Sequence, residues 1–279
     1  MNHRADAYAW RVAASGLCLF TFGLGCLLAS ALIVPAIALV SRDGTVRRRR
    51  IRGFLSRSYA FFLWLGRALG VISFEIHGAE RLSRPGQLIV ANHPSLIDML
   101  FVGAQVPLLD CIVKASLSTH PGLRAIVHGA DYIPNGAPAH LVRDCAATLH
   151  AGHSLLVFPE GTRSRPGQPL SLTRGAARIA LAARCDLLPV TIVCQPSSLT
   201  KSDVWYRVPA SRPHWRVMVD EPIALEAVLV AGESPIQSAR RLTDHLGTHF
   251  ATRIAACAVD PSVVRPARAI APTLARARP

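Results

Sequence analysis

From residue 76 onward, short apolar runs alternate with longer stretches in which apolar residues recur every three or four positions. Short apolar runs bounded by turn residues are typical of buried strands, and the longer periodic stretches are typical of amphipathic helices. The pattern predicts strands at residues 87–91, 111–115, 131–134, 154–158, 187–194 and 215–220. It predicts helices at residues 96–104, 121–127, 139–150, 173–184 and 234–258. Alternating strands and helices predict an α/β fold in which helices flank a mostly parallel, mixed sheet.

The N-terminal part has a different pattern, because residues 12–41 contain no charged residue. A helix of this length would run about 45 Å at about 1.5 Å per residue, which exceeds the roughly 30 Å hydrocarbon core of a bilayer. It can therefore span with tilt, or bend at Pro35 and lie partly in the interface. The apolar region of a signal peptide is only about 7–15 residues long, so we expect a retained membrane anchor.

Arginines follow this segment closely, at positions 42, 47–50, 52 and 57, whereas only Arg4 and Arg11 precede it. The positive-inside rule then places the following domain on the cytoplasmic side of the inner membrane. The same cluster would attract anionic membrane lipids. A nucleic-acid patch is the alternative, but the position beside a membrane segment argues against it, and we expect no nucleic-acid partner.

Residues 59–74 are apolar and aromatic but are interrupted by Arg67. They predict an amphipathic helix at the bilayer surface, with Tyr59 and Trp64 at head-group level, or alternatively a core helix of the following domain. The expected organisation is an anchor and interfacial helix at residues 1–75, an α/β domain at residues 76–260 and a disordered basic tail at residues 261–279.

Composition supports an anionic, membrane-associated setting. The 279 residues are 51% hydrophobic and 17% charged, with a net charge of +14. A strongly basic balance suits lipid head groups, phosphorylated substrates or nucleic acid. The seven cysteines are odd in number and lack the spacing of a zinc site, so we expect reduced thiols, no disulfide framework and no metal site.

The first chemical motif is Asn-His-Pro-Ser-Leu-Ile-Asp at residues 92–98. Pro94 must turn the chain after the strand, and Ser95 can cap the next helix. His93 then lies at the end of a strand, and Asp98 lies one turn into the helix, where it can face the imidazole. This is the arrangement of a general base held by a carboxylate. A helix-capping role for Asp98 is the structural alternative.

The second motif is Phe-Pro-Glu-Gly-Thr-Arg-Ser at residues 158–164, which ends a strand at the same sheet edge. Gly161 would let the backbone approach a ligand, and Arg163 offers a planar fork for phosphate. Thr162 and Ser164 add hydroxyl donors. Glu160 would orient Arg163 or bind an acceptor hydroxyl; a Pro-Gly turn with a surface ion pair is the alternative.

The two motifs, in this order and spacing, resemble the lysophospholipid acyltransferase family, the glycerolipid acyltransferases related to 1-acylglycerol-3-phosphate acyltransferase. The resemblance covers roughly residues 76–222. It implies a glycerolipid acyltransferase-like fold and a membrane-bound O-acyltransferase. It also implies acyl-CoA or acyl carrier protein as co-substrate, with no cofactor, and a lysophospholipid acceptor.

The sequence lacks a Gly-x-Ser-x-Gly elbow, so it does not suggest a serine acyl-enzyme. We therefore expect direct attack by an acceptor hydroxyl that His93 activates, with Asp98 stabilising the imidazolium. Asn92 would fix the turn or donate a hydrogen bond near the thioester. The alternative is a basic, non-catalytic lipid-binding protein at the membrane surface, in which these residues are structural.

Between the motifs the chain resembles the family at Lys114 but departs from it at Asn135, where the family has an arginine associated with acceptor phosphate. Loss of one charge-assisted contact would weaken phosphate binding by about 1.5–3 kcal/mol unless another group replaces it. Lys114, Arg124 or Arg143 could do so. A non-phosphatidate acceptor, such as an amino-acid lipid or a specialised acyl product, therefore stays open.

Overall fold

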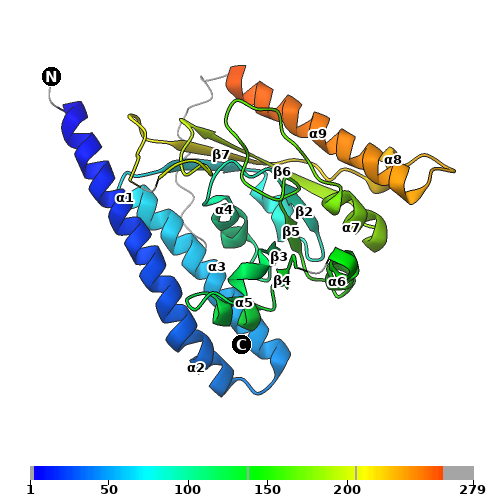
Figure 1. Cartoon of the computed structure of the whole chain (residues 1–279), viewed down its shortest axis with the longest axis horizontal. Helices are drawn as coiled ribbons and strands as arrows, with labels where there is room; N and C mark the ends of the chain where they lie inside the picture. Colours follow the sequence, from blue (N-terminus) through cyan, green and yellow to red (C-terminus); the bar gives the residue numbers. More distant parts are fainter. Residues whose placement is uncertain (1–2, 137, 205, 260–279) are drawn as a thin grey trace.

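The computed structural model describes residues 3–136, 138–204 and 206–259 and contains one mixed sheet (Figure 1). The spatial order of its strands is β1-β7-β6-β2-β5-β3-β4, and every neighbouring pair is parallel except β6 and β7. The predicted mostly parallel, mixed sheet is confirmed. The strands are β1 (Ser73–His77), β2 (Leu88–Ala91), β3 (Asp110–Val113), β4 (Ile133–Pro134), β5 (Leu155–Val157), β6 (Leu187–Gln195) and β7 (His214–Val219).

Helices cover both faces of the sheet, and each face has its own apolar core. One face carries α3 (Gly44–Ala68), α4 (Asp98–Gln105) and α5 (Arg124–Ala130). The other carries α6 (Pro138–His150), α7 (Gly175–Ala183), α8 (Leu225–Val228) and α9 (Pro235–Val259). Short 3-10 turns lie at Ala79–Ser83 and Ala115–Leu117. The buried strand β2, apolar on both sides, joins the two cores.

The structure differs from the sequence pattern around residues 59–74. Helix α3 ends at Ala68, and Gly70 adopts a left-handed conformation with φ of 71° that stops the helix. Residues 73–77 then form β1, which pairs in parallel with β7. Apolar and aromatic residues suit either element, so composition alone did not separate the helix from the edge strand. The tail predicted at residues 261–279 lies outside the described residues.

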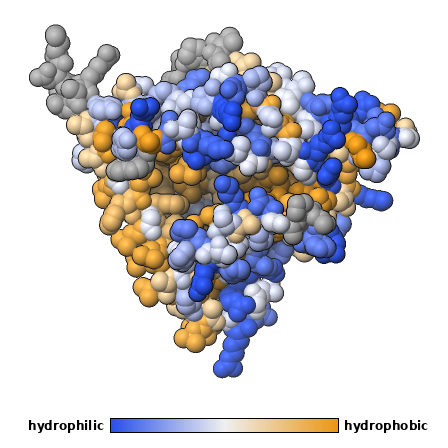
Figure 2. Space-filling model, viewed as in Figure 1, coloured by the Kyte–Doolittle hydropathy of each residue, from blue (hydrophilic) through white to orange (hydrophobic). Residues whose placement is uncertain are grey.

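The N-terminal apolar segment is one long helix made of α1 (His3–Leu28), a π-helical turn (Ala29–Ile33) and α2 (Val34–Val40). The π turn directly precedes Pro35, whose ring cannot fit a regular helix and displaces the carbonyl one turn earlier. Within the described residues, one helix, Tyr8–Val40, is long and apolar enough to cross a membrane. Its outer face forms the apolar edge of the molecule at the lower left of Figure 2, with exposed Leu17, Phe20, Leu24, Leu27, Leu32 and Leu39.

This long helix packs against α3, and small residues make the close contact possible. A Cβ atom on Gly129 of α5 would lie 2.8 Å from Val34 of α2 and 2.9 Å from Ile51 of α3. A Cβ atom on Gly103 of α4 would lie 2.6 Å from the Tyr59 ring of α3. Because glycine has no side chain, these two positions leave space in which residues of α2 and α3 pack against α4 and α5. Helix α3 is thus both part of the domain core and the element on which the apolar helix rests.

A buried ion pair also joins α3 to the sheet. Nη1 of Arg52 donates to Asp110 Oδ2 at 2.7 Å, Nη2 donates to Oδ1, and Nε donates to the Ala130 carbonyl at 2.8 Å. The two side chains are only 2% and 4% exposed. Burial raises the pKa of Asp110 to about 6 even beside the guanidinium, so the carboxylate is ionised at neutral pH. Arg52 therefore stabilises the fold, unlike the exposed arginines that surround it in the sequence.

Replacing Asp110 with Asn should destabilise the fold, because it leaves the Arg52 guanidinium buried without its counter-ion. We expect a loss of about 3–5 kcal/mol in the free energy of unfolding. Asp131→Asn is the matched control, since Asp131 pairs with Arg48 at the surface and such pairs contribute about 0–1 kcal/mol. Denaturant unfolding of detergent-solubilised protein measures both, and equal losses would contradict a special role for the buried pair.

Candidate active site

The two sequence motifs meet at one edge of the sheet. Strands β2 and β5 are parallel neighbours, with Val90 opposite Val157. The loop at residues 92–97 leaves β2 and the loop at residues 158–174 leaves β5, so both start at the carboxyl ends of adjacent strands. Strand pairing therefore brings together segments that are more than 60 positions apart in the chain.

His93 and Asp98 lie in direct contact. The distance from His93 Nδ1 to Asp98 Oδ2 is 2.9 Å, and Asp98 is fully buried whereas the imidazole is 21% exposed. Asp98 also accepts hydrogen bonds from the backbone N–H of Ser95 and from the Ser95 hydroxyl, both at 2.7 Å. Burial raises the pKa of Asp98, and the three donors oppose this rise. With Nδ1–H donated to the carboxylate, Nε2 is left as the acceptor.

The structure does not show Asp98 as a helix cap. Helix α4 begins at Asp98 rather than at Leu96, its N-cap residue is Ile97, and no side chain caps it. The Ser95 N–H that bonds Asp98 lies in the loop before the helix. The carboxylate therefore holds the loop and the imidazole together.

The second motif holds His93 from the other side. Glu160 Oε1 accepts hydrogen bonds from the His93 backbone N–H at 2.9 Å and from the Ser164 hydroxyl at 2.8 Å. The Ser164 N–H donates to the His93 carbonyl at 2.7 Å. The Phe158 ring stacks on the imidazole, with centroids 4.2 Å apart. Both the backbone and one ring face of His93 are thus fixed by this motif.

Glu160 does not orient Arg163 in this arrangement. Nη1 of Arg163 donates instead to the carbonyls of Leu199 and Thr200, at 2.9 and 2.8 Å, in the loop between β6 and β7. The Leu96 N–H donates to the same Leu199 carbonyl at 3.0 Å. Arg163 therefore ties the second motif to a loop that also contacts the first.

Asn92 and Gly161 lie where the sequence placed them, with roles the structure now specifies. The Asn92 side chain is buried, and its amide bonds both the N–H and the carbonyl of Ile192, at 2.7 and 2.8 Å, joining β2 to β6. Gly161 has φ of 66° with open space at its Cβ position, so the turn conformation, and not a close contact, demands glycine there. Thr162 is exposed at this turn.

Lys114 and Asn135 lie further along the same edge of the sheet. The row of paired residues includes Val90–Val157, Leu156–Cys111 and Val113–Pro134 across β2, β5, β3 and β4, so Lys114 and Asn135 follow directly after β3 and β4. Lys114 is exposed, and Asn135 Oδ1 accepts from the Ala115 N–H at 3.0 Å. This end of the row is therefore exposed and polar, whereas Asn92 is buried.

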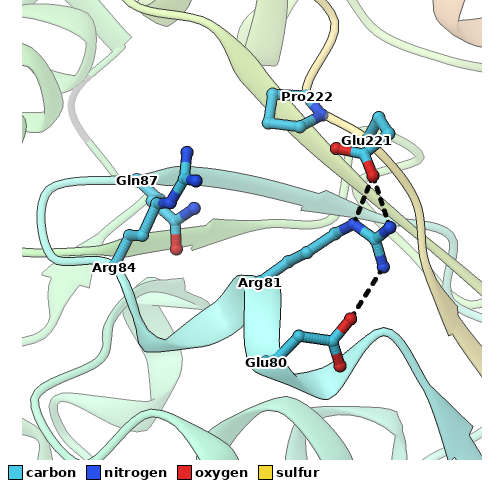
Figure 3. Close-up of a pocket in the computed structure, with 6 residues that line it drawn as sticks. All are labelled: Glu80, Arg81, Arg84, Gln87, Glu221 and Pro222. Atoms are coloured by element: carbon cyan, nitrogen blue, oxygen red, sulfur yellow. Dashed lines mark hydrogen bonds and ion pairs between the residues drawn. The ribbon is translucent and has the colours of Figure 1, made fainter.

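Two surface pockets in the described part of the chain lie away from His93. One, of about 120 Å³, is lined by residues such as Arg81, Arg84 and Gln87, at the opposite end of β2. Arg81 is engaged there by Glu80 and Glu221 (Figure 3). The other is lined by Arg52 and Asp110, which form the buried ion pair. Ion pairs within the protein thus engage the arginines that line both pockets.

Sequence reasoning missed two contacts of the site. Ser95 was expected to cap a helix, but its hydroxyl bonds Asp98. Trp215 on β7 donates its indole N–H to the same hydroxyl at 3.0 Å. A contact across 120 positions leaves no local pattern in the sequence, so nothing around Trp215 could have indicated it.

Comparison with known proteins agrees with the arrangement of the two motifs. Residues 73–193, which contain both, match the family model named Acyltransferase. The match covers less than half of the chain and lies within the α/β domain. The resemblance inferred from the motifs is confirmed.

Two relatives of the acyltransferase domain are proteins of Pseudomonas aeruginosa. A lyso-ornithine lipid O-acyltransferase is 34% identical over 134 residues, covering 46% of this chain and 51% of the relative. A 1-acyl-sn-glycerol-3-phosphate acyltransferase is 27% identical over 150 residues, covering 51% and 58%. The chain thus spans about half the length of these curated relatives.

The fold matches a crystal structure of the 1-acyl-sn-glycerophosphate acyltransferase PlsC from Thermotoga maritima. The TM-score is 0.65 at 20% identity, and the match covers 88% of this chain and 96% of that one. The predicted fold class of the acyltransferase domain is confirmed.

Glu160→Gln should lower the rate of acyl transfer less than Glu160→Ala does. Gln keeps an oxygen at Oε1 to accept from His93 N–H, and we expect transfer within about threefold of wild type. Ala leaves that N–H unpaired, which costs about 1–3 kcal/mol, or about 5- to 150-fold in rate. Transfer of a labelled acyl chain in membrane fractions measures this. If Gln is as damaging as Ala, the carboxylate charge itself acts on substrate.

Proposed function

We propose that this chain transfers a fatty acyl group from acyl-CoA or acyl carrier protein to the free hydroxyl of a lysophospholipid such as 1-acylglycerol-3-phosphate. The observation that carries the proposal is the His93–Asp98 contact. Because the Asp98 carboxylate accepts from His93 Nδ1, Nε2 is left as a proton acceptor. Phe158 of the second motif stacks on the same ring. Such a pair suits removal of a proton from an alcohol.

The reaction balances with these two substrates and needs no cofactor. The acceptor oxygen attacks the thioester carbonyl as its proton moves to His93 Nε2. The tetrahedral oxyanion then collapses, the C–S bond breaks, and the thiolate takes the proton from the imidazolium. Asp98 stays ionised throughout and stabilises the imidazolium, as in other carboxylate–histidine pairs.

The substrate groups have exposed partners beside His93. We assign the Thr162 hydroxyl and the part of the Arg163 guanidinium that does not bond the loop carbonyls to polar groups of the substrates. Lys114, further along the row, suits an anionic head group by its charge and exposure. Asn92, Glu160 and Gly161 act by shaping the loops, since their polar atoms or backbone conformation serve the protein itself.

The apolar N-terminal helix is the element that would place the reaction at a membrane. Arg42, Arg47, Arg49 and Arg50 are exposed next to the end of α2. We propose that Tyr8–Val40 seats the domain on the inner membrane, with these arginines at anionic head groups on the cytoplasmic side. Because α1 and α2 pack along α3, the active site is held at a fixed orientation to the bilayer.

A phosphate-free acceptor is a second candidate, favoured by Asn135. The side chain that stands in place of the family arginine is neutral and already bonds the Ala115 N–H. One relative of the domain is named a lyso-ornithine lipid O-acyltransferase, and its acceptor is an amino-acid lipid. The same transfer chemistry would then act on a lyso-ornithine lipid or a similar amino-acid lipid.

His93→Ala should lower acyl transfer by about 10²- to 10⁴-fold, because the general base is lost. Asp98→Asn should approach the same loss, since an amide can donate to Nδ1 and leave the proton on Nε2. Asp131→Asn, the same change at an exposed carboxylate, is the control and should leave transfer unchanged. Measurement uses membranes with labelled acyl-CoA or acyl carrier protein and lysophosphatidic acid. Unchanged transfer in His93→Ala would overturn the catalytic assignment, and a wild type inactive with every donor would favour the non-catalytic lipid-binding alternative.

Asn135→Arg should raise kcat/KM for lysophosphatidic acid by about tenfold or more, because it adds a charge-assisted contact to phosphate. The rate with lyso-ornithine lipid should not rise. Asn135→Met, which loses the same amide without adding charge, separates the effect of charge from that of the lost Ala115 contact. An unchanged preference would remove Asn135 from the head-group surface, and the wild-type preference decides between the two acceptors.

A further inference from the structure

Trp215 lies on β7, the strand next to the edge strand β1, outside both sequence motifs. It is fully buried on β7, opposite Phe74 of β1 and Cys194 of β6, and its ring packs near Phe101 of α4. A phenylalanine or leucine could fill such a core position. The indole N–H, however, needs a partner when it is buried, and it finds one in the first motif: Ser95 Oγ at 3.0 Å.

The chemistry of the indole fixes the direction of this contact. An indole nitrogen only donates, so Ser95 Oγ must accept from it. A hydroxyl carries one proton, and the remaining partner of Ser95 Oγ is Asp98 Oδ1 at 2.7 Å. The Ser95 hydroxyl must therefore donate to Asp98. Oδ2, on the other side of the same carboxylate, is left for the Ser95 N–H and His93 Nδ1.

We propose that Trp215 is a positioning residue of the active site: its N–H sets the Ser95 hydroxyl as a donor to Asp98, and so fixes the carboxylate that holds His93. The proposal rests on the proposed function of His93 as general base. It adds a further group, from a strand that carries neither motif, to those that hold the histidine in place. Trp215 acts through Ser95 and Asp98 and does not touch substrate.

The surroundings of Asp98 make this donor important. Burial raises the pKa of this carboxyl, and each hydrogen-bond donor favours its ionised form. The other titratable groups near it are His93, Glu160 from the β5 loop and Cys194 from β6. Glu160 carries like charge and Cys194 is a buried thiol, so neither stabilises the carboxylate. The stabilisation comes from His93, then from the Ser95 N–H, and then from the Ser95 hydroxyl. The hydroxyl is the donor that Trp215 orients, and hydrogen bonds in a chain polarise one another.

The test is a double-mutant cycle of Trp215→Phe and Ser95→Ala, with kcat and KM measured from about pH 5 to pH 9. Trp215→Phe should lower kcat about three- to tenfold with KM unchanged, and Ser95→Ala should lower it further. With weaker donation to Oδ1, the carboxylate holds the imidazolium more tightly. The acid limb of the kcat profile should therefore move to higher pH in both variants.

The double variant distinguishes positioning from simple packing. If Trp215 acts through Ser95, the double variant should match Ser95→Ala alone in both rate and pH profile. If Trp215 only fills space, its replacement should lower the rate by the same factor in either background and leave the acid limb in place. That second outcome would overturn the proposal. Poor folding of Trp215→Phe leaves Ser95→Ala as the deciding variant, because its acid limb must still move.

A spectroscopic measurement separates this inference from the proposed function. The proton between His93 Nδ1 and Asp98 should give a low-field NMR resonance in ¹⁵N-histidine-labelled protein, which should be absent in His93→Ala. We expect it to move further downfield or broaden in Trp215→Phe, because the carboxylate then holds the imidazole N–H more tightly, and to stay in place in Trp64→Phe, an exposed tryptophan. If the resonance does not change in Trp215→Phe, the positioning role of Trp215 is wrong, even if His93 proves catalytic. If the resonance does change in Trp215→Phe but acyl transfer is unchanged in His93→Ala, only the catalytic role of His93 is wrong.

Discussion

The candidate active site is built around one fully buried carboxylate. Asp98 carries its charge in the interior only because three donors surround it, one of them the His93 imidazole, since an unpaired ion there would be far too costly. Those donors come from the loop that also carries the histidine. The loop must therefore fold tightly over Asp98, and Pro94 and the start of α4 make it do so. Local chain geometry and the electrostatics of one side chain thus define the position of His93 together.

The parallel sheet brings the second motif next to the loop that carries His93. Adjacent parallel strands end at the same edge, so the loop after β5 reaches the loop after β2 without any long connection. Glu160 and Ser164 then bond the His93 backbone on both sides, and Asn92 bonds β6. The second motif thus holds the loop of the first motif in position. The two motifs therefore depend on each other in the fold, although each alone resembles an ordinary turn.

The sequence predicted most of this arrangement where local pattern decides structure. The strand before His93, the helix after Asp98 and the edge shared by both motifs follow from apolar runs, proline and alternation. Two expectations went differently because they depended on long-range contacts. Glu160 was expected to pair with its sequence neighbour Arg163, yet each found its partner on another loop. Residues 73 and 74 looked like the end of an interfacial helix, but they begin strand β1, which pairs with β7. The strand that contains Trp215 was predicted, but its contact with Ser95 had no local signal.

The arginine run shows how helix geometry divides one charged segment between two roles. Arg48 and Arg52 are four positions apart, so they lie on the same face of α3, and both point toward the domain, at Asp131 and Asp110. Arg47, Arg49 and Arg50 lie on other faces and are exposed. A count of arginines treats all of them as membrane contacts, but the helical period assigns some to the protein. Because the same helix carries both sets, the buried Arg52–Asp110 pair helps to set how the exposed arginines are placed relative to the sheet. In the function that we propose, the position of His93 relative to a lipid hydroxyl therefore depends in part on an ion pair at the other end of the sheet.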